Sequence, residues 1–502
     1  MPDGKGISYV EGESTLSIYE NITLYAIWKI PLEFTYQADS DSFSVTHFTR
    51  NVSSFVIPSE YNGKPVTSIG DSAFDGCSGL TSVAIPDSVT SIGNYVFSDC
   101  SGLTSITIPS SVESIGSHAF DGCSGLTSIT IPESVTSIGY GAFSACRGIK
   151  SVTINDYISG SRRLGDLFEA SYKDIELIVI PEGVTSIGPS AFSGCSNLKE
   201  VTIPEGVTSI GDSAFSGCSG LESIAIPEGV TSIGDSAFSG CSGLTSIMIP
   251  SSVTSIGEDA FMDCENLSIV FAEGTTEIPD AAYDNGHYEA WGDPGIVSVT
   301  IPEGVTRIGR YAFYGCSGLT SITIPEGVAS IGDYAFYGCS GLESITIPEG
   351  VTSIGDWAFY GCSGLTSIAI PEGVVAIGKE AFSYCRGLTD VTLPSSIEYL
   401  GECVFSGSGS LAIVFSEGTA KIPSSWFNGH PLPWGSPGII SITIPSSVTI
   451  IGDRAFYDCS RLSDINYGGT KTQWESIFKC ALWDYNSGNY TIHCTDGDIS
   501  KN

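Results

Sequence analysis

Positive charge is scarce in this sequence. Lysine and arginine together number 20 among 502 residues, against 56 aspartates and glutamates, so the formal net charge is −36. Nucleic acids and anionic lipid surfaces are bound by clustered basic side chains that displace counterions. The composition therefore excludes a nucleic-acid-binding protein and a protein that is held on an anionic membrane by its charge.

Long apolar runs are missing as well. No segment approaches eighteen consecutive apolar residues, so the sequence predicts no membrane-spanning helix. The first six residues, Met1–Gly6, lack the apolar stretch of a secretory signal peptide. Hydrophobic residues nevertheless make up 41% of the chain, which is sufficient for a buried core and argues against disorder.

Histidine and the common catalytic motifs are also rare. The five histidines are His47, His118, His287, His430 and His493. The sequence contains no G-x-S-x-G, no H-E-x-x-H and no glycine-rich phosphate loop. We therefore expect a non-enzymatic protein, with no catalytic residues, no cofactor and no metal site.

One repeat of 23 residues dominates the chain. Pro204–Ile226 and Pro227–Ile249 differ at only two positions. Three longer gaps, near residues 150–180, 268–300 and 412–444, each contain one irregular coil, so about 17 coils are expected. A marker phenylalanine occupies the same position in the regular coils: Phe74, Phe97, Phe120, Phe143, Phe192, Phe215, Phe238, Phe261, Phe313, Phe336, Phe359, Phe382, Phe405 and Phe456.

Each coil has the pattern and the length of a leucine-rich repeat. Within Leu103–Ile108, Ile106 and Ile108 alternate with polar residues, so they point inward from a strand. Pro109 ends that strand because it has no N–H to donate, and Gly116 allows a tight corner. The aspartate that follows this glycine in many coils is a good helix N-cap. The pattern predicts one parallel strand and one short helical turn per coil, with the stacked array as the folding unit.

The repeat resembles the BspA-like class of bacterial leucine-rich repeats, of the Treponema and Bacteroides type, with a consensus close to IPxxVTSIGxxAFxxCxxLTSIT. The resemblance implies a right-handed leucine-rich-repeat solenoid with a cap at each end. Residues 31–65 resemble the N-terminal cap, residues 66–465 form the array, and residues 466–502 resemble the C-terminal cap. Asn21–Trp28 is similar to the end of a Listeria–Bacteroides repeat, so residues 1–30 are interpreted as a partial repeat or linker, and the chain as a fragment or a truncated gene product.

Thirteen of the sixteen cysteines lie three residues after a marker phenylalanine, so they form one column along the stack. Disulfide geometry would require this column to be distorted, and no Cys or His spacing fits zinc. We therefore expect buried free thiols, with scattered disulfides as the alternative. Cys480 and Cys494, in the C-terminal cap, are candidates for one disulfide.

Two polar ladders are expected on the surface. Serines and threonines line the exposed strand face, which favours a hydrogen-bonding surface for a protein or glycan over an ice-binding surface. Glutamates occupy the turn after the strand, where one carboxylate per coil favours a solvated rim over a calcium site. These glutamates are Glu182, Glu205, Glu228, Glu303, Glu326, Glu349 and Glu372.

The surface composition changes between coils that are otherwise nearly identical. Two positions in each coil, two residues before and one residue after the marker phenylalanine, are serines in the coils of Phe192, Phe215 and Phe238. Because both positions flank an inward ring, we expect partial exposure and a contact patch for sugars or proteins. The alternatives are lateral packing of these rings and simple drift of the repeats. The same positions of three later coils hold Tyr311, Tyr314, Tyr334, Tyr337, Trp357 and Tyr360.

The second and third irregular coils share a short sequence that the first one lacks. One copy contains His287 and Trp291, and the other contains His430 and Trp434. Extra residues leave a solenoid as loops, and loops carry function more often than the scaffold does. These four side chains are candidates for a contact site, and duplicated structural padding is the alternative.

These features predict a non-enzymatic protein of the cell surface. The resemblance implies an exported bacterial adhesin or recognition protein that binds an extracellular protein or glycan through its repeat array. We expect a monomer that neither binds nucleic acid nor inserts into a membrane. Two alternatives are a structural spacer of a larger surface protein and a carbohydrate-binding module.

Overall fold

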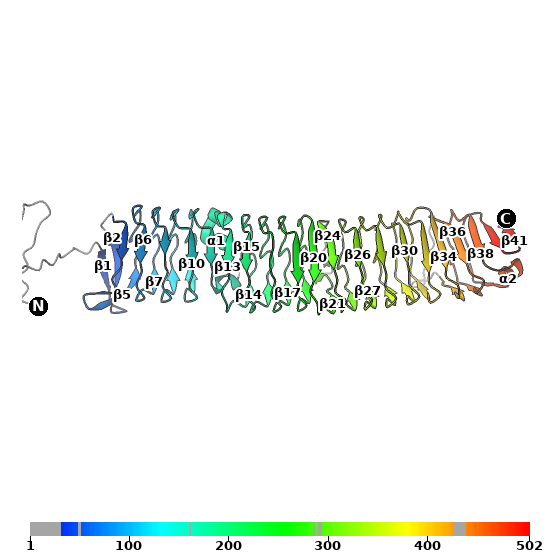
Figure 1. Ribbon diagram of the computed structural model, residues 1–502, viewed down its shortest axis with the longest axis horizontal. Helices are drawn as coiled ribbons and strands as arrows, with labels where there is room; N and C mark the ends of the chain where they lie inside the picture. Colours follow the sequence, from blue (N-terminus) through cyan, green and yellow to red (C-terminus); the bar gives the residue numbers. More distant parts are fainter. Residues whose placement is uncertain are drawn as a thin grey trace, which may run out of the picture.

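The computed structural model describes residues 32–48, 52–160, 162–284, 287–289, 294–424 and 438–501. Its coils are stacked side by side into an elongated solenoid that runs from the N-terminal to the C-terminal end (Figure 1). The stack has about 18 turns, where about 17 are expected. Asn21–Trp28 lies outside the described residues. In the described part, no helix has the length and apolar character needed to cross a membrane.

A regular coil contributes two short strands, whereas the sequence predicts one. In the coil after Phe97 these are β8 (Ser105–Ile106) and β9 (Ser114–Ile115). Each strand pairs in parallel with its counterpart 23 residues away, so that Ser114 pairs with Ser91 on one side and with Ser137 on the other. The solenoid therefore carries two parallel ladders of strands, each of which is divided into several hydrogen-bonded sheets.

The strand bounds follow the repeat. The first ladder comprises β3 (Ser54–Val56), β6 (Ser82–Ala84), β8, β10 (Ser128–Thr130), β12 (Ser151–Thr153), β13 (Leu177–Val179), β15 (Glu200–Thr202), β18 (Ser246–Ile249), β20 (Leu267–Phe271), β24 (Ile296–Thr300), β26 (Ser321–Thr323), β28 (Ser344–Thr346), β30 (Ser367–Ala369), β32 (Asp390–Leu393), β34 (Leu411–Phe415), β36 (Ile439–Ile444), β38 (Asp464–Tyr467) and β40 (Thr491–Cys494). The second comprises β2 (Ser42–Phe48), β5 (Lys64–Ile69), β7 (Ser91–Ile92), β9, β11 (Ser137–Ile138), β14 (Ser186–Ile187), β16 (Ser209–Ile210), β17 (Ser232–Ile233), β19 (Ser255–Ile256), β21 (Glu277–Ile278), β25 (Arg307–Ile308), β27 (Ser330–Ile331), β29 (Ser353–Ile354), β31 (Ala376–Ile377), β33 (Tyr399–Leu400), β35 (Lys421–Ile422), β37 (Ile450–Ile451) and β39 (Phe478–Lys479).

The segment that carries Ala-Phe is a series of turns, so the predicted helical turn is wrong. The residue before the alanine has a positive φ, 54° at Ser213 and 57° at Tyr334, and a left-handed residue does not continue a right-handed helix. Its N–H bonds to the next coil instead, as from Ser213 to the carbonyl oxygen of Asp235 at 2.7 Å. The predicted N-cap is also wrong, because Asp212 Oδ1 accepts the N–H of Asp235 at 3.1 Å and thus joins two coils.

Stacked phenylalanine rings form the centre of the core. The ring centroids of Phe97 and Phe120 lie 5.3 Å apart, and those of Phe120 and Phe143 lie 5.1 Å apart. In the first irregular coil, Phe168 at the end of α1 (Leu164–Phe168) continues this stack at 5.3 Å from Phe143. A residue of the irregular segment thus fills the place of a marker phenylalanine.

Except for the half-buried Cys77, the cysteines of the column are buried near these rings, and all sixteen cysteines have free thiols. The Cys146 thiol donates to the carbonyl oxygen of Phe120 at 3.0 Å. Burial raises the pKa of the Cys146 thiol to about 12, so the proton that makes this bond is retained at neutral pH. The predicted column of buried thiols is confirmed, and Cys480 and Cys494 are not bonded to each other.

The corner glycines have a different role from the one predicted. A Cβ atom on Gly116 would lie 2.5 Å from the backbone carbonyl carbon of Gly93 in the preceding coil. Real Cβ atoms do not come so close to backbone, so the missing side chain is what allows neighbouring coils to stack at this corner. The requirement is close approach between coils rather than a special backbone angle.

Antiparallel hairpins lie at the two ends of the stack. β1 (Leu32–Gln37) pairs with β2, and β2 in turn pairs in parallel with β5, which also pairs with β4 (Glu60–Tyr61). At the other end β40 pairs with β41 (Gly497–Ser500), and the short helix α2 (Lys471–Ser476) precedes them. The N-terminal hairpin therefore continues the second ladder, and the C-terminal hairpin continues the first.

The first two irregular coils accommodate their extra residues differently. The first contains the 3-10 helices η1 (Asp156–Ser159) and η2 (Glu169–Asp174) on either side of α1. The second forms an antiparallel hairpin of β22 (Ala282–Asp284) and β23 (His287–Glu289). The extra residues thus form short helices or a hairpin outside the regular stack, as expected for a solenoid.

Candidate functional site

Two columns of aromatic rings run along the third regular block, the coils of Phe313 to Phe382. Ring centroids in the first column are 4.4 and 4.9 Å apart, and those in the second are 4.7 and 4.6 Å apart. Rings of the same coil in different columns are 5.7 Å apart. We name these six residues the aromatic double stack. The first column is Tyr311, Tyr334 and Trp357, and the second is Tyr314, Tyr337 and Tyr360.

The turns of the scaffold hold the first column at intervals of one coil. Tyr311, Tyr334 and Trp357 have φ angles of 57°, 57° and 54°, in the left-handed region that bulky residues rarely occupy. The N–H of Tyr334 donates to the carbonyl oxygen of Asp356 in the next coil at 2.8 Å, which stabilises this conformation. A left-handed residue costs about 1–2 kcal/mol, so inter-coil bonding imposes the angle whatever the side chain.

All six side chains of the double stack are half-buried. Because rings within a column stack face to face, the exposed parts are mainly ring edges and tyrosine hydroxyls. The structure thus combines lateral packing with partial exposure, the two features that the sequence interpretations set against each other. It provides a rigid, partly apolar surface that carries regularly spaced polar groups.

The hydroxyls of Tyr334 and Tyr337 hold their protons more tightly than an exposed tyrosine does. Burial raises the pKa of the Tyr334 and Tyr337 hydroxyls above the ordinary value. The carboxylates of Asp356 and Asp333 raise the pKa of Tyr334 further, although a hydrogen bond with Tyr311 opposes them. At neutral pH these groups can therefore both donate and accept hydrogen bonds.

Basic side chains lie over aromatic rings at the C-terminal end of the double stack. The Lys379 ammonium is 5.2 Å from the centroid of the Trp357 ring. Tyr384 continues the second column at 5.2 Å from Tyr360, with the Arg386 guanidinium 5.8 Å from its ring. Sequence reasoning missed these residues, although the replacement of the usual aspartate by Lys379 was a visible signal.

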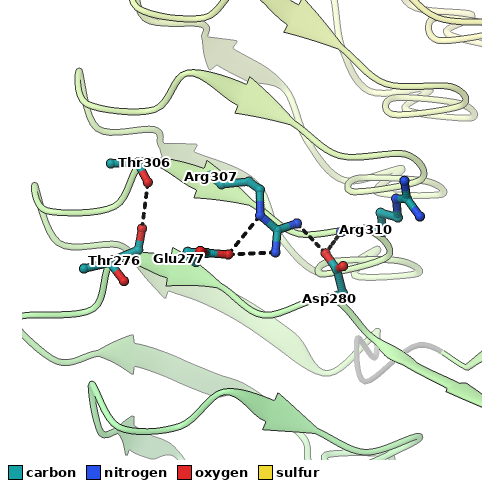
Figure 2. Close-up of polar contacts among 6 residues, drawn as sticks. All are labelled: Thr276, Glu277, Asp280, Thr306, Arg307 and Arg310. Carbon is teal, nitrogen blue, oxygen red and sulfur yellow. Dashed lines mark hydrogen bonds and ion pairs between the residues drawn. The ribbon is translucent and has the colours of Figure 1, made fainter.

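A charged brace precedes the double stack (Figure 2). The Arg307 guanidinium donates to Glu277 at 2.8 Å and to Asp280 at 2.6 Å, and both acids belong to the preceding irregular coil. Asp280 also accepts the backbone N–H of Arg310 at 2.8 Å. Since Arg310 stands directly before Tyr311, the brace fixes the first aromatic coil against the irregular coil.

Of the four loop candidates, only His287 lies within the described residues, in β23. Trp291, His430 and Trp434 lie outside them. Both polar ladders, the seven glutamates and the serines and threonines of the strand face, are exposed. In the described part of the chain, no three His, Cys, Asp or Glu side chains are grouped so that they could hold a metal ion.

Sequence reasoning also missed a smaller aromatic cluster in the first regular block, the coils of Phe74 to Phe143. Tyr95 stacks on the His118 imidazole at 5.1 Å, and Tyr140 meets His118 edge to face at 6.1 Å. Tyr95 and His118 stand two residues before a marker phenylalanine, as Tyr311 does, and both have a positive φ. Alignment of every coil on that phenylalanine would have revealed this column.

The family described as the BspA type leucine rich repeat region matches residues 42–162, 166–289, 287–412 and 421–495. These matches span most of the repeat array and extend into both of its ends. No protein of curated function matches the chain.

Several solved structures are similar to the chain. A leucine-rich repeat protein from Bacteroides ovatus is 28% identical over 93% of this chain and 100% of that one, with a TM-score of 0.43. A leucine rich cell surface protein from Faecalibacterium prausnitzii is 29% identical over 91% of this chain and 99% of that one, with a TM-score of 0.29. A leucine rich repeat protein from T. pallidum is 30% identical over 43% of this chain and 88% of that one, with a TM-score of 0.30.

Proposed function

The chain belongs to the family of BspA-type leucine-rich repeat proteins, and on that premise we propose that it is a non-enzymatic recognition protein of a bacterial cell surface. Its role is adhesive: the repeat array binds a protein ligand outside the cell. The contact surface is the aromatic double stack. The rest of the solenoid holds that surface in a fixed place on a long, acidic scaffold.

The pre-formed geometry of the double stack carries this proposal. Tyrosine and tryptophan offer a large amphipathic contact area at a small cost in side-chain entropy. Here the rings are already ordered by stacking, at 4.4 to 4.9 Å. Binding therefore loses little of the free energy that immobilising mobile side chains would cost, about 0.5–1.5 kcal/mol for each one.

The same geometry favours a protein over a sugar. A sugar ring stacks on an open aromatic face, but within each column the faces are covered by neighbouring rings. Ring edges and hydroxyls remain, and these match the mixed apolar and polar chemistry of a protein interface.

The test is binding of the purified protein to immobilised extracellular-matrix proteins and to a glycan panel. The test variant changes all six double-stack residues to serine. Ser190, Ser213 and Ser236 adopt the same left-handed conformation at the first-column position, so the variant should fold normally. We expect affinity for a matrix protein to fall at least about tenfold, as for loss of a hot-spot cluster.

A matched control removes aromatic rings from the same column of the first block, by Tyr95→Ser and His118→Ser. Binding that survives this control but not the six-serine variant supports the double stack as the contact surface. Equal binding by the six-serine variant and the wild type would refute it and direct attention to the strand face. Binding to glycans alone would instead indicate a carbohydrate-binding module, and no binding at all would favour a spacer.

A further inference from the structure

Asp356 is a half-buried carboxylate in the middle of the third block. It directly precedes Trp357, and its Oδ1 atom accepts the backbone N–H of Lys379 at 2.6 Å. Among the described residues, no basic side chain forms an ion pair with it. Removing a carboxylate from water without a counter-charge is unfavourable, and burial accordingly raises the pKa of the Asp356 carboxyl.

The basic side chains around Asp356 are engaged by other groups. Arg310 pairs with Asp333 at 3.5 Å, one coil before Asp356. The Lys379 ammonium pairs with Glu402 at 3.2 Å and lies over the ring of Trp357. Within the described part of the chain, both cations therefore pair with other carboxylates, and only the longer-range attraction of Lys379 acts on the charge of Asp356.

Two tyrosines, one in the preceding coil and one two coils later, are close enough to feel the charge of this carboxylate: burial raises the pKa of the Tyr334 and Tyr399 hydroxyls, and Asp356 raises both further. Tyr334 stands in the preceding coil and bonds to the backbone of Asp356. Tyr399, which is 38% exposed, stands two coils later, because Ser353, Ala376 and Tyr399 are paired in sequence along the second ladder. A half-buried carboxylate beside tyrosines suits a guanidinium, which bonds to a carboxylate with two N–H groups and is more weakly hydrated than an ammonium, so it enters such a site more readily.

We propose that the aromatic double stack binds a basic segment of its protein partner, and that an arginine of that segment pairs with Asp356. This inference rests on the proposed function and names the chemistry of the ligand. Cations already lie over rings at this end of the double stack, since Lys379 lies over Trp357 and Arg386 lies over the adjoining Tyr384. The net charge of −36 also attracts a basic partner over long range.

The probe is an immobilised peptide of alternating arginine and serine. Its control peptide carries citrulline at each arginine position, which keeps the shape and removes the charge. The test variant is Asp356→Asn. Asn94 occupies the same repeat position and its Oδ1 accepts the N–H of Ser117 at 2.8 Å, so asparagine preserves the bond between coils.

The matched control variant is Asp212→Asn, which removes the same charge from the second regular block, the block that contains the serine-bearing coils of Phe192, Phe215 and Phe238. We expect the wild type to bind the arginine peptide and not the citrulline peptide. Asp356→Asn should weaken that binding at least about fivefold, and Asp212→Asn should change it less than about twofold. Equal losses for the two variants, or equal affinity for the two peptides, would overturn the inference, because attraction would then be non-specific.

The two experiments distinguish a failure of the proposed function from a failure of this inference. If the six-serine variant loses matrix-protein binding while Asp356→Asn retains it, the double stack is the contact surface and only its preference for arginine is refuted. If the six-serine variant binds the matrix proteins as the wild type does, the proposed function itself fails. If both proposals hold, a competing arginine peptide should displace the bound matrix protein.

Discussion

The second and third regular blocks share one backbone and differ in their surface. Ser213 and Tyr334 have φ angles of 54° and 57° at equivalent positions. Their N–H groups donate to Asp235 and Asp356 of the next coils at 2.7 and 2.8 Å. The second block nevertheless presents small hydroxyls where the third presents six aromatic rings.

This difference shows that the scaffold and the surface chemistry are independent. The inter-coil hydrogen bonds and the buried rings fix the backbone, and neither depends on the side chain at the two surface positions. A solenoid can therefore acquire a binding surface by substitution at these positions alone, since each coil contacts mainly its neighbours. The double stack is a local feature on a uniform rod, and substitutions in matched coils can test this separation.

The largest expected effect is the same in both blocks. Phe215→Ala and Phe336→Ala each remove a fully buried ring, and each should cost about 3–5 kcal/mol of local stability because a cavity remains. Hydrogen exchange read by mass spectrometry would report the free energy of opening in each block. If Phe336→Ala costs at least about 2 kcal/mol more local stability than Phe215→Ala does, the double stack is energetically coupled to the core.

Corner glycines should give a smaller, equally matched loss. A Cβ atom on Gly234 or Gly355 would lie 2.6 Å from the backbone nitrogen of Asp212 or Asp333. Overpacking of this kind costs about 1–3 kcal/mol, so Gly234→Ala and Gly355→Ala should lower the thermal midpoint by similar amounts. A loss confined to one block would contradict the equivalence of the two scaffolds.

The sequence predicts the scaffold well because its main determinants recur every 23 residues. Ile129, Phe120 and Cys123 are buried as the repeat requires. The helical turn was wrong because the relevant hydrogen bonds connect different coils, as the bond from Phe97 to Ala119 does. A prediction from local propensity does not include hydrogen bonds whose partner lies in the neighbouring coil.

The candidate site is predictable only in part, for a related reason. The repeat places Tyr334 and Trp357 in one column, but it does not determine that their faces stack at 4.9 Å. That arrangement depends on side-chain rotamers. The ion pair of Lys379 with Glu402 rather than with Asp356 is equally hidden, because it also depends on side-chain rotamers.

Transplanting the double stack into the second block tests directly whether the two blocks differ only in these six side chains. The second block would receive tyrosine at Ser190, Ser193, Ser213, Ser216 and Ser239, and tryptophan at Ser236. Each stacked pair should add about 0.5–1.5 kcal/mol beyond its buried area, so the thermal midpoint should rise modestly. Ligand stoichiometry, measured by isothermal titration calorimetry, should change from one to two. Unchanged stoichiometry in a folded variant would mean that the rings alone do not make the binding surface.

The smallest expected effect concerns the pH dependence of stability at Asp356. Burial raises the folded-state pKa of Asp356 above the ordinary value of 3.8, so the folded chain holds this proton more tightly than the unfolded chain does. Stability from this group is therefore fully present below pH 3.8 and is lost as pH rises through the raised folded-state pKa. Asp356→Asn should consequently unfold at a slightly higher temperature than the wild type at pH 7, and the difference should vanish near pH 3. Asp212→Asn serves as the control in the same differential scanning series.

The same measurement with a basic peptide tests the proposed pairing. A peptide that pairs with Asp356 should lower the pKa of this carboxyl and remove the stability advantage of the asparagine variant at pH 7. An advantage that persists in saturating peptide would show that the bound arginine lies elsewhere.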